Sequence, residues 1–221
     1  MTPASLTNYW NTLYAQRQLE QAGWFQPHAS AALHLFARAG LPFDAPVVDV
    51  GAGLSPFLNS LLAQGYTNLI ATDLSAAALD QHRCQLPPEF AERVLSVVDD
   101  VTAPKYLPLL DPVLLWHDRG LLHGLMSATQ TQAYCRLMDH MVLAHGWVLL
   151  GVRAPQPGPP LTEAGLLVQP YDVAGLTALL GANYALRDTL EEVHETPQGE
   201  KQGYTYGLFQ RNATSRTGTW Q

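Results

Sequence analysis

The sequence has few cysteines, few basic residues and no long hydrophobic run. Cys84 and Cys135 are the two cysteines in 221 residues, so we expect neither a disulfide framework nor a cysteine-based metal site. Lys and Arg total 12 against 19 Asp and Glu, which argues against a nucleic-acid or anionic-membrane partner. The longest apolar runs fall short of the roughly 18 residues that span a bilayer. With no signal-peptide pattern, the sequence predicts a soluble cytoplasmic protein.

Segments rich in Val, Ile and Leu alternate with helical patterns, which is typical of βαβ units around a mostly parallel sheet. Strands are expected at 45–50, 68–72, 94–98, 112–116, 147–152, 184–193 and 202–210. Helices are expected at 5–20, 28–39, 75–84, 129–143 and 172–180, with one more ending near residue 64. This order predicts an α/β fold, a Rossmann-like doubly wound seven-stranded sheet, mostly parallel, with an antiparallel terminal strand and an N-terminal helical cap.

Three parts are expected along the chain. Residues 1–40 form the helical cap, residues 41–211 form the α/β domain that carries the ligand site, and residues 212–221 form a polar tail. A short polar terminus of this kind is typically disordered.

A glycine-containing turn follows the first strand and precedes a helix, in the segment VVDVGAGLS. Gly51 and Gly53 allow a tight turn and let a ligand lie against bare backbone. Asp73 follows Gly53 by twenty residues and ends the second strand, where a carboxylate can accept hydrogen bonds from both ribose hydroxyls. Taken singly, each feature is an ordinary turn or strand end, whereas together they predict a nucleoside ligand.

Such a turn binds either a dinucleotide or S-adenosylmethionine (SAM), and three features favour SAM. Asp49 stands two positions before Gly51, where the amino group of SAM can use a carboxylate. Pro56 occupies the place of the third glycine of the dinucleotide fingerprint. Asp100 and Val101 follow the third strand, where an adenine amino group needs an acceptor. Because the carboxyl ends of parallel strands share one edge of the sheet, these residues predict a SAM site there.

Polar residues at the end of the fourth strand supply the candidates for chemistry. Arg119 can hold an anionic acceptor by a bidentate contact, unless Arg119 and Asp118 pair with each other and only fix the loop. His117 either touches the acceptor or packs at the strand end. His123 is expected on a helix, on the same side as Arg119, and His194 lies in the terminal hairpin. The candidate catalytic residues are Asp118, Arg119 and His117.

Aromatic residues gather in the expected cap. Trp10, Tyr14, Trp24 and Phe25 either pack the cap on the sheet or form a lid over the ligand. An aromatic face also attracts a cation such as a sulfonium.

These motifs resemble those of class I SAM-dependent methyltransferases. The resemblance covers about residues 8 to 211 and rests on the segments VVDVGAGLSPFLNSLLAQGY, ATDLSAAAL, VDDVTAP and LLWHDRGLLHGL. It is nearest to a group of small bacterial enzymes with a Trp-His-Asp-Arg motif at the end of strand four. The Asp118-Arg119-Gly120 run is similar to thiopurine-type methyltransferases, and the N-terminal Tyr-Trp segment is similar to small protein-lysine methyltransferases.

The resemblance implies a set of cofactor-binding residues. Asp49 and the two glycines would hold the methionine part of SAM, Asp73 the ribose, and Asp100 and Val101 the adenine. Asp118 would lie under the sulfonium end, and two tryptophans would close over the cofactor. The full set is Trp10, Trp24, Asp49, Gly51, Gly53, Asp73, Leu74, Asp100 and Val101.

The activity implied is methyl transfer from SAM, with S-adenosylhomocysteine (SAH) as the product. No large inserted recognition domain is evident, so a small-molecule acceptor is favoured, in particular a soft nucleophile such as a thiol. A protein lysine is the alternative acceptor, and a non-catalytic SAM-binding protein is a further alternative. A nicotinamide-dependent oxidoreductase is disfavoured by Asp49 and by the missing third glycine.

Overall fold

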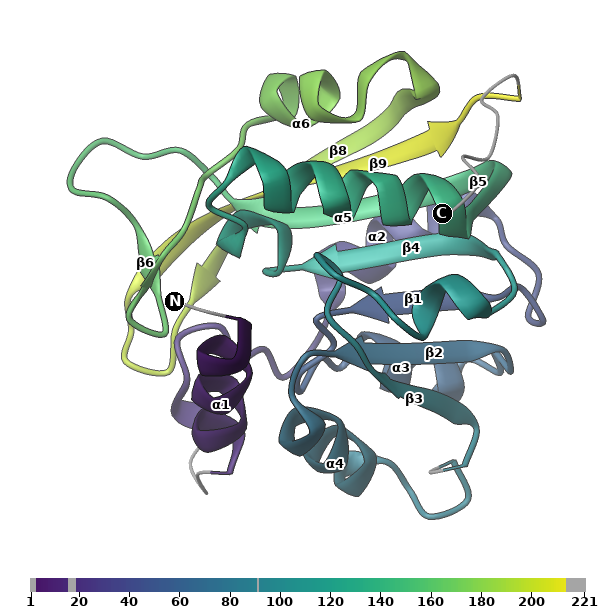
Figure 1. Ribbon diagram of the computed structural model, residues 1–221, viewed down its shortest axis with the longest axis horizontal. Helices are drawn as coiled ribbons and strands as arrows, with labels where there is room; N and C mark the ends of the chain where they lie inside the picture. Colours follow the sequence, from purple (N-terminus) through teal and green to yellow (C-terminus); the bar gives the residue numbers. More distant parts are fainter. Residues whose placement is uncertain (1–2, 16–18, 91, 214–221) are drawn as a thin grey trace.

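The computed structural model describes residues 3–15, 19–90 and 92–213 (Figure 1). Within these ranges the strands of the main sheet are β1 (Val47–Val50), β2 (Leu69–Asp73), β3 (Val94–Val98), β4 (Val113–Arg119), β5 (Val142–Arg153), β8 (Tyr184–Glu195) and β9 (Lys201–Arg211). Their order in space is β3-β2-β1-β4-β5-β9-β8. Strand β9 runs antiparallel to both of its neighbours, and the pairs from β3 to β5 are parallel. The predicted seven-stranded, mostly parallel sheet with an antiparallel terminal strand is confirmed.

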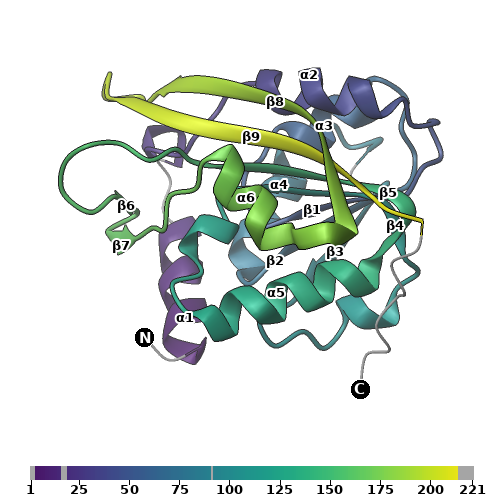
Figure 2. The same cartoon turned by 90° about the horizontal axis from the view of Figure 1, so that it is seen from above.

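Helices cover both faces of this sheet (Figure 2). They are α2 (Ser30–Ala39), α3 (Phe57–Ala63), α4 (Ala76–Gln85), α5 (Ala128–Met141) and α6 (Val173–Leu180). Helices α2, α3 and α4 share one buried cluster with one face of the strands, and α5 and α6 share a second cluster with the other face. Burial of both faces explains why the central strands are continuously apolar rather than alternating with polar residues.

Neighbouring residues of a strand face opposite layers, and this alternation decides which helix each one meets. Val47 and Leu115 belong to the cluster of α2 and α3, whereas Val48 and Trp116 belong to the cluster of α5. The same period of two carries on to the carboxyl ends of the strands, where the polar candidates lie.

Helix starts agree with the local sequence. Ser75 is the N-cap of α4, because its side chain accepts the backbone N–H of Ala78. Ser127 and Gln130 form a reciprocal capping box at the start of α5. Each cap satisfies backbone donors that the first turn of a helix leaves free.

Two small elements stand at the carboxyl end of the parallel strands. One is α1 (Pro3–Tyr14), followed by a short 3-10 turn at Leu19–Gln21, and the other is the hairpin of β6 (Thr162–Glu163) and β7 (Leu166–Leu167). Figure 1 shows α1 and β6 beside this end of the sheet. The other helix of the expected cap, α2, packs on the face of the sheet instead.

Several predicted boundaries were wrong. The helix expected at 5–20 ends at Tyr14, and residues 16–18 lie outside the described residues. The fourth and fifth strands are longer than predicted and extend to Arg119 and Arg153. His123 lies on a 3-10 turn rather than an α-helix. Most of the expected tail also lies outside the described residues. Among the helices that the structure describes, none has the length and apolarity needed to cross a membrane.

A buried carboxylate organises the loop after β3. Asp99 accepts the backbone N–H groups of Lys105, Tyr106 and Leu107 at 2.8 to 3.1 Å. Only 6% of Asp99 is exposed, so water cannot easily replace these bonds. Asp99 therefore holds the loop that carries Asp100 and Val101.

We expect Asp99→Ala to lower the free energy of unfolding by about 2 to 4 kcal/mol, because buried backbone donors lose their acceptor. Urea unfolding measures this change. The control is Asp80→Ala, which removes an exposed surface pair with Arg83 and should cost under about 0.5 kcal/mol. Equal effects of the two substitutions would contradict the role assigned to Asp99.

Candidate functional site

A cavity of about 220 Å³ opens at the carboxyl edge of the sheet, between the strand ends, α1 and the β6–β7 hairpin. Its lining has two parts. The Asp73 half comprises Thr72, Asp73, Leu74, Asp100, Val101 and Thr102, and the Arg119 half comprises Arg119, His123, Leu125, Glu163, Leu166 and Val168. Trp10, Tyr14, Trp24 and Gly51 also line it. A second space of about 50 Å³ shares Tyr14, Trp24, Gly51 and Arg119 with the first and is also lined by Asp49 and Gly53.

The glycine turn after β1 adopts a conformation that other residues avoid. Gly51 has a φ of 65° and Gly53 a φ of 47°, both in the left-handed region that favours glycine. A Cβ atom on Gly51 would lie 2.8 Å from Leu121, and one on Gly53 would collide with the hydroxyl of Tyr14. Both glycines are therefore required by backbone shape and by the close approach of the side chains that cover them.

Asp73 ties the glycine turn to the end of β2. Its Oδ2 accepts the backbone N–H of Gly53 at 2.9 Å, and its Oδ1 accepts that of Ser75 at 2.8 Å. Burial raises the pKa of Asp73 to about 6. The hydroxyl of Ser75 donates to Asn11 of α1 at 2.8 Å, so the same network anchors the helix that covers the cavity.

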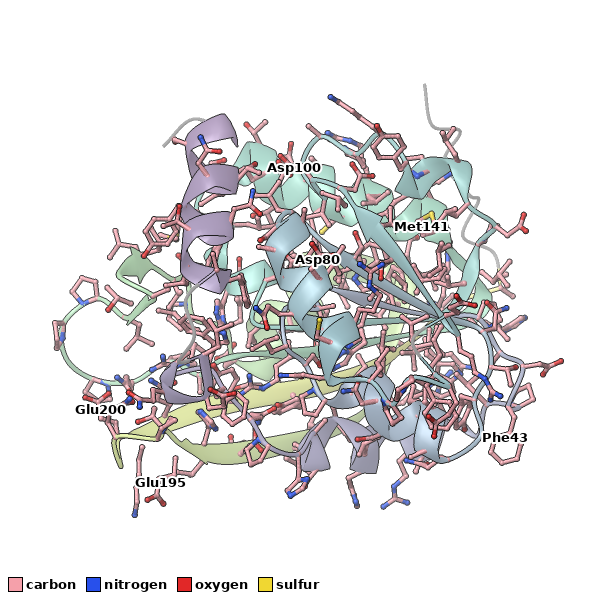
Figure 3. The ribbon with its side chains drawn as sticks, turned by 90° about the horizontal axis from the view of Figure 1, so that it is seen from below. Phe43, Asp80, Asp100, Met141, Glu195 and Glu200 are labelled. Atoms are coloured by element: carbon pink, nitrogen blue, oxygen red, sulfur yellow. The ribbon has the colours of Figure 1, made fainter. Side chains whose placement is uncertain are left out.

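Asp100 and Val101 stand on the far side of the Asp73 half. Asp100 Oδ1 accepts both the backbone N–H and the hydroxyl of Thr102, at 2.8 and 2.7 Å. Figure 3 shows Asp100 near α1, with Phe43 and Met141 toward the opposite end of the molecule. The structure thus brings the residues that follow β2 and β3 to one cavity wall, as the sequence predicted.

Asp49 and His117 form a buried pair beneath the glycine turn. His117 Nδ1 donates to Asp49 Oδ1 at 2.7 Å, and its ring stacks on Phe57 at 3.9 Å between ring centroids. Asp49 lines the smaller space, whereas His117 lines neither space among the described residues. Asp49 Oδ2 has no hydrogen-bond partner among the described residues. The structure places His117 as the residue that orients Asp49.

Asp118 points to the opposite face of the sheet. Its carboxylate accepts the N–H groups of Leu121 and Leu122 at 2.9 and 3.0 Å, and the hydroxyl of Tyr134 at 2.8 Å. Burial raises the pKa of Asp118 to about 6. Asp118 does not belong to the described lining of either space. It shapes the turn after β4 from behind and does not pair with Arg119.

Arg119 faces the cavity and is held on two sides. Its Nε donates to the hydroxyl of Tyr206 at 3.0 Å, and its Nη1 donates to the backbone oxygen of Trp24 at 3.0 Å. The guanidinium lies 4.4 Å from the centre of the Tyr204 ring, a cation–π distance. Nη2 is buried and has no partner within the described part of the chain.

His123 and the β6–β7 hairpin complete the Arg119 half. The backbone N–H of Arg153 donates to His123 Nδ1 at 3.0 Å, so Nε2 carries the ring proton. This Nε2 lies 2.8 Å from Glu163 Oε2. The hydroxyl of Tyr9 donates to the backbone oxygen of Ala164, which joins α1 to the hairpin across the cavity.

The aromatic residues of the expected cap line the two spaces. Trp10 and Trp24 line the cavity and contact each other edge to face at 5.9 Å between centroids. Phe25 lines the smaller space. His194 donates from Nε2 to the backbone oxygen of Gly23 at 2.9 Å and so ties β8 to the segment that carries Trp24.

Sequence reasoning missed the residues that support Arg119. Tyr204 and Tyr206 lie on one face of β9, and the period of two in KQGYTYGLFQ could have shown that they face the same way. Glu163 belongs to strands of two residues each, which are too short to give a pattern. Arg153 was one residue beyond the predicted end of its strand.

No protein-family model matches the chain, and a search of curated proteins found no match. Many solved structures share its fold. A SAM-dependent methyltransferase from Anabaena variabilis is 13% identical, with a TM-score of 0.73 over 95% of each chain. A protein of echinomycin biosynthesis, solved in work on the conversion of a disulfide bond into a thioacetal group, is 16% identical, with a TM-score of 0.70 over 96% of this chain and 94% of that chain.

A third similar structure is the 1,6-didemethyltoxoflavin-N1-methyltransferase of Burkholderia thailandensis, which holds 1,6-didemethyltoxoflavin and SAH. It is 20% identical, with a TM-score of 0.66 over 96% of this chain and 91% of that chain. These similarities show that the chain has the Rossmann-like fold of these methyltransferases.

Gly151 lets Tyr206 lie across β5 to reach Arg119, because a Cβ atom on Gly151 would come within 2.5 Å of the Tyr206 ring. We expect Gly151→Ala to lower the free energy of unfolding by about 2 to 3 kcal/mol, since the ring must shift in a packed layer. Urea unfolding tests this expectation. Gly124→Ala is the control, because a Cβ atom there meets nothing within 4 Å. A loss below about 0.5 kcal/mol for Gly151→Ala would contradict the packing argument.

Proposed function

We propose that this protein is a SAM-dependent methyltransferase, with residues 41–211 as the domain that carries the catalytic site and α1 as the cap over it. One observation carries the proposal: the glycine turn, Asp73 and Asp100 line a single cavity at the carboxyl edge of the sheet. In doubly wound α/β folds this edge is where ligands bind.

The residues present fit SAM. Asp73 can accept hydrogen bonds from the ribose, and Asp100 with Leu74 and Val101 would border the adenine. Asp49 Oδ2 is buried beside the glycine turn without a partner in the part of the chain that the structure describes, so the amino group of the methionine part would satisfy it. The sulfonium would lie near Trp10 and Trp24, whose rings attract a cation.

The bound cofactor supplies an activated methyl group, and the chain's own residues must align the acceptor and exclude water. The hairpin–α1 contact through Tyr9 and Ala164 closes one side of the cavity. Arg119, His123 and Glu163 then stand where the acceptor would enter.

The Arg119 half favours an acceptor that needs no proton removed by the protein. The Nδ1 lone pair of His123 is already taken by a backbone N–H. Burial raises the pKa of Glu163, but the hydrogen bond with His123 and the charges of Arg119 and Arg153 outweigh it and hold the pKa below its usual value. A group with a lowered pKa is a weak base. We therefore propose a small soft nucleophile, such as a thiol that reacts as its thiolate.

Two similar structures fit a small acceptor. One comes from work on a conversion at sulfur, and another holds the small molecule 1,6-didemethyltoxoflavin. A protein lysine remains the second candidate, because four carboxylates, those of Asp73, Asp99, Asp100 and Glu163, line the cavity and would attract an ammonium group. A SAM-binding protein without catalysis is the third.

One assay, with methyl-labelled SAM, a panel of thiols and a lysine-rich protein extract, distinguishes the acceptor classes. We expect label in the small-molecule fraction, and none when Asp73→Ala replaces the wild type. Label on protein would instead support the lysine candidate. SAH binding without any transfer would support the non-catalytic one.

Cofactor affinity should also depend on pH. Burial raises the pKa of Asp73 to about 6, and only the ionised carboxylate offers both oxygens to ribose hydroxyls. We therefore expect SAH to bind about tenfold more weakly at pH 5 than at pH 7.5. Calorimetry at both pH values measures this change.

Lowering the pH should weaken SAH binding but stabilise the fold, so the loss of binding is not a consequence of unfolding. Because the pKa of Asp73 is raised in the folded state, the folded protein takes up this proton at a higher pH than the unfolded chain does. Protonation of Asp73 between pH 6 and 4 therefore adds to the stability of the fold. The matched variant Asp73→Asn should bind SAH weakly at both pH values. A pH dependence that persists in this variant would contradict the assignment to Asp73.

A further inference from the structure

Two arginines with unused hydrogen-bond donors stand side by side at the Arg119 half. Arg119 ends β4 and Arg153 ends β5, and both side chains flank the ring of Tyr204, at 4.4 and 5.8 Å from its centre. Nη2 of Arg119 and Nε and Nη1 of Arg153 are buried without a partner in the described ranges. A buried donor without an acceptor costs about 1 to 3 kcal/mol.

We propose that this half of the cavity binds the methyl acceptor as a small organic anion, with Nη2 of Arg119 as its contact and Arg153 as a second positive charge behind it. This inference rests on the proposed function and names the substrate class of the same site.

Arg119 is positioned for such a contact rather than for a structural one. Tyr206 and the backbone oxygen of Trp24 hold two of its three nitrogens, which fixes the plane of the guanidinium. Tyr206 in turn donates to Glu192 at 3.0 Å, so its hydroxyl oxygen is oriented to accept from Arg119. The third nitrogen belongs to a residue that lines both spaces of the site.

The carboxylates near Arg119 and Arg153 do not balance the positive charge of the two guanidinium groups. Glu163 contributes one negative charge opposite two guanidinium groups. Its close contact is with His123 Nε2 at 2.8 Å, and Nδ1 of the same ring accepts the backbone N–H of Arg153. Glu192 accepts from Tyr206 and Gln26. An anionic ligand would supply the acceptor oxygen or sulfur that Nη2 lacks.

The other side chains of the Arg119 half are apolar. Trp24, Leu125, Leu166 and Val168 contribute to it, so the anion should carry a hydrocarbon body, such as an aromatic ring. A thiol of this kind gives its proton to solvent and binds as the thiolate. The sulfur lone pair then forms the bond to the methyl carbon, and the bond from that carbon to the sulfonium breaks with its electrons staying on the cofactor sulfur. The reaction thus neutralises both the thiolate and the sulfonium, and the protein has no proton to remove.

The test uses the full protein saturated with SAH, titrated by calorimetry with benzoate and with benzamide. The two probes have the same size, and only benzoate carries a negative charge. We expect benzoate to bind at least about tenfold more tightly than benzamide. In Arg119→Gln this preference should vanish while SAH affinity stays within about threefold, and Arg119→Lys should restore part of it.

The control is Arg38→Gln, which removes an exposed arginine paired with Asp188 and should leave both probes unchanged. Equal binding of benzoate and benzamide to the wild type would overturn the anion site, whatever the variants do. A preference that survives in a folded Arg119→Gln would overturn the role of Arg119. Failure of SAH to bind the wild type would instead refute the proposed function on which this inference rests.

Discussion

The site depends on one carboxylate, that of Asp73, which joins the glycine turn, the start of α4 and, through Ser75, helix α1. It accepts backbone N–H groups from the glycine turn after β1 and from the start of α4. Ser75, which caps that helix, also bonds Asn11 of α1. The carboxylate therefore joins the turn to the second strand directly, and Ser75 joins the covering helix to the same network. Because burial raises the pKa of Asp73 to about 6, the charge at this junction can be titrated near neutral pH.

Successive side chains of β4 face opposite sides of the sheet, so three consecutive residues have different roles. His117 and Arg119 face the layer of α2 and α3, whereas Asp118 faces α5. His117 orients Asp49, Asp118 shapes the following turn through Tyr134 and two backbone groups, and Arg119 reaches the cavity. A motif that is contiguous in sequence thus supports three different parts of the site, and only its last residue faces the cavity.

The sequence predicted the sheet and the Asp73 half because both follow from local rules. Apolar runs of strand length, Gly51 and Gly53 in a turn, and acidic residues at strand ends can each be recognised within a short segment of the chain. The Arg119 half could not be predicted in this way. Tyr206 reaches Arg119 from 87 residues away, and it does so only because Gly151 lacks a side chain between them. Glu163 arrives on a hairpin whose strands are two residues long, so tertiary contacts alone place it.

If the cavity between α1 and the strand ends binds SAM, a crystal structure of the protein grown with SAH will show the ribose hydroxyls on Asp73, the amino group beside Asp49 Oδ2, and the sulfur directed toward the Arg119 half. SAH bound elsewhere, or bound with its ribose away from Asp73, would refute a SAM site in this cavity.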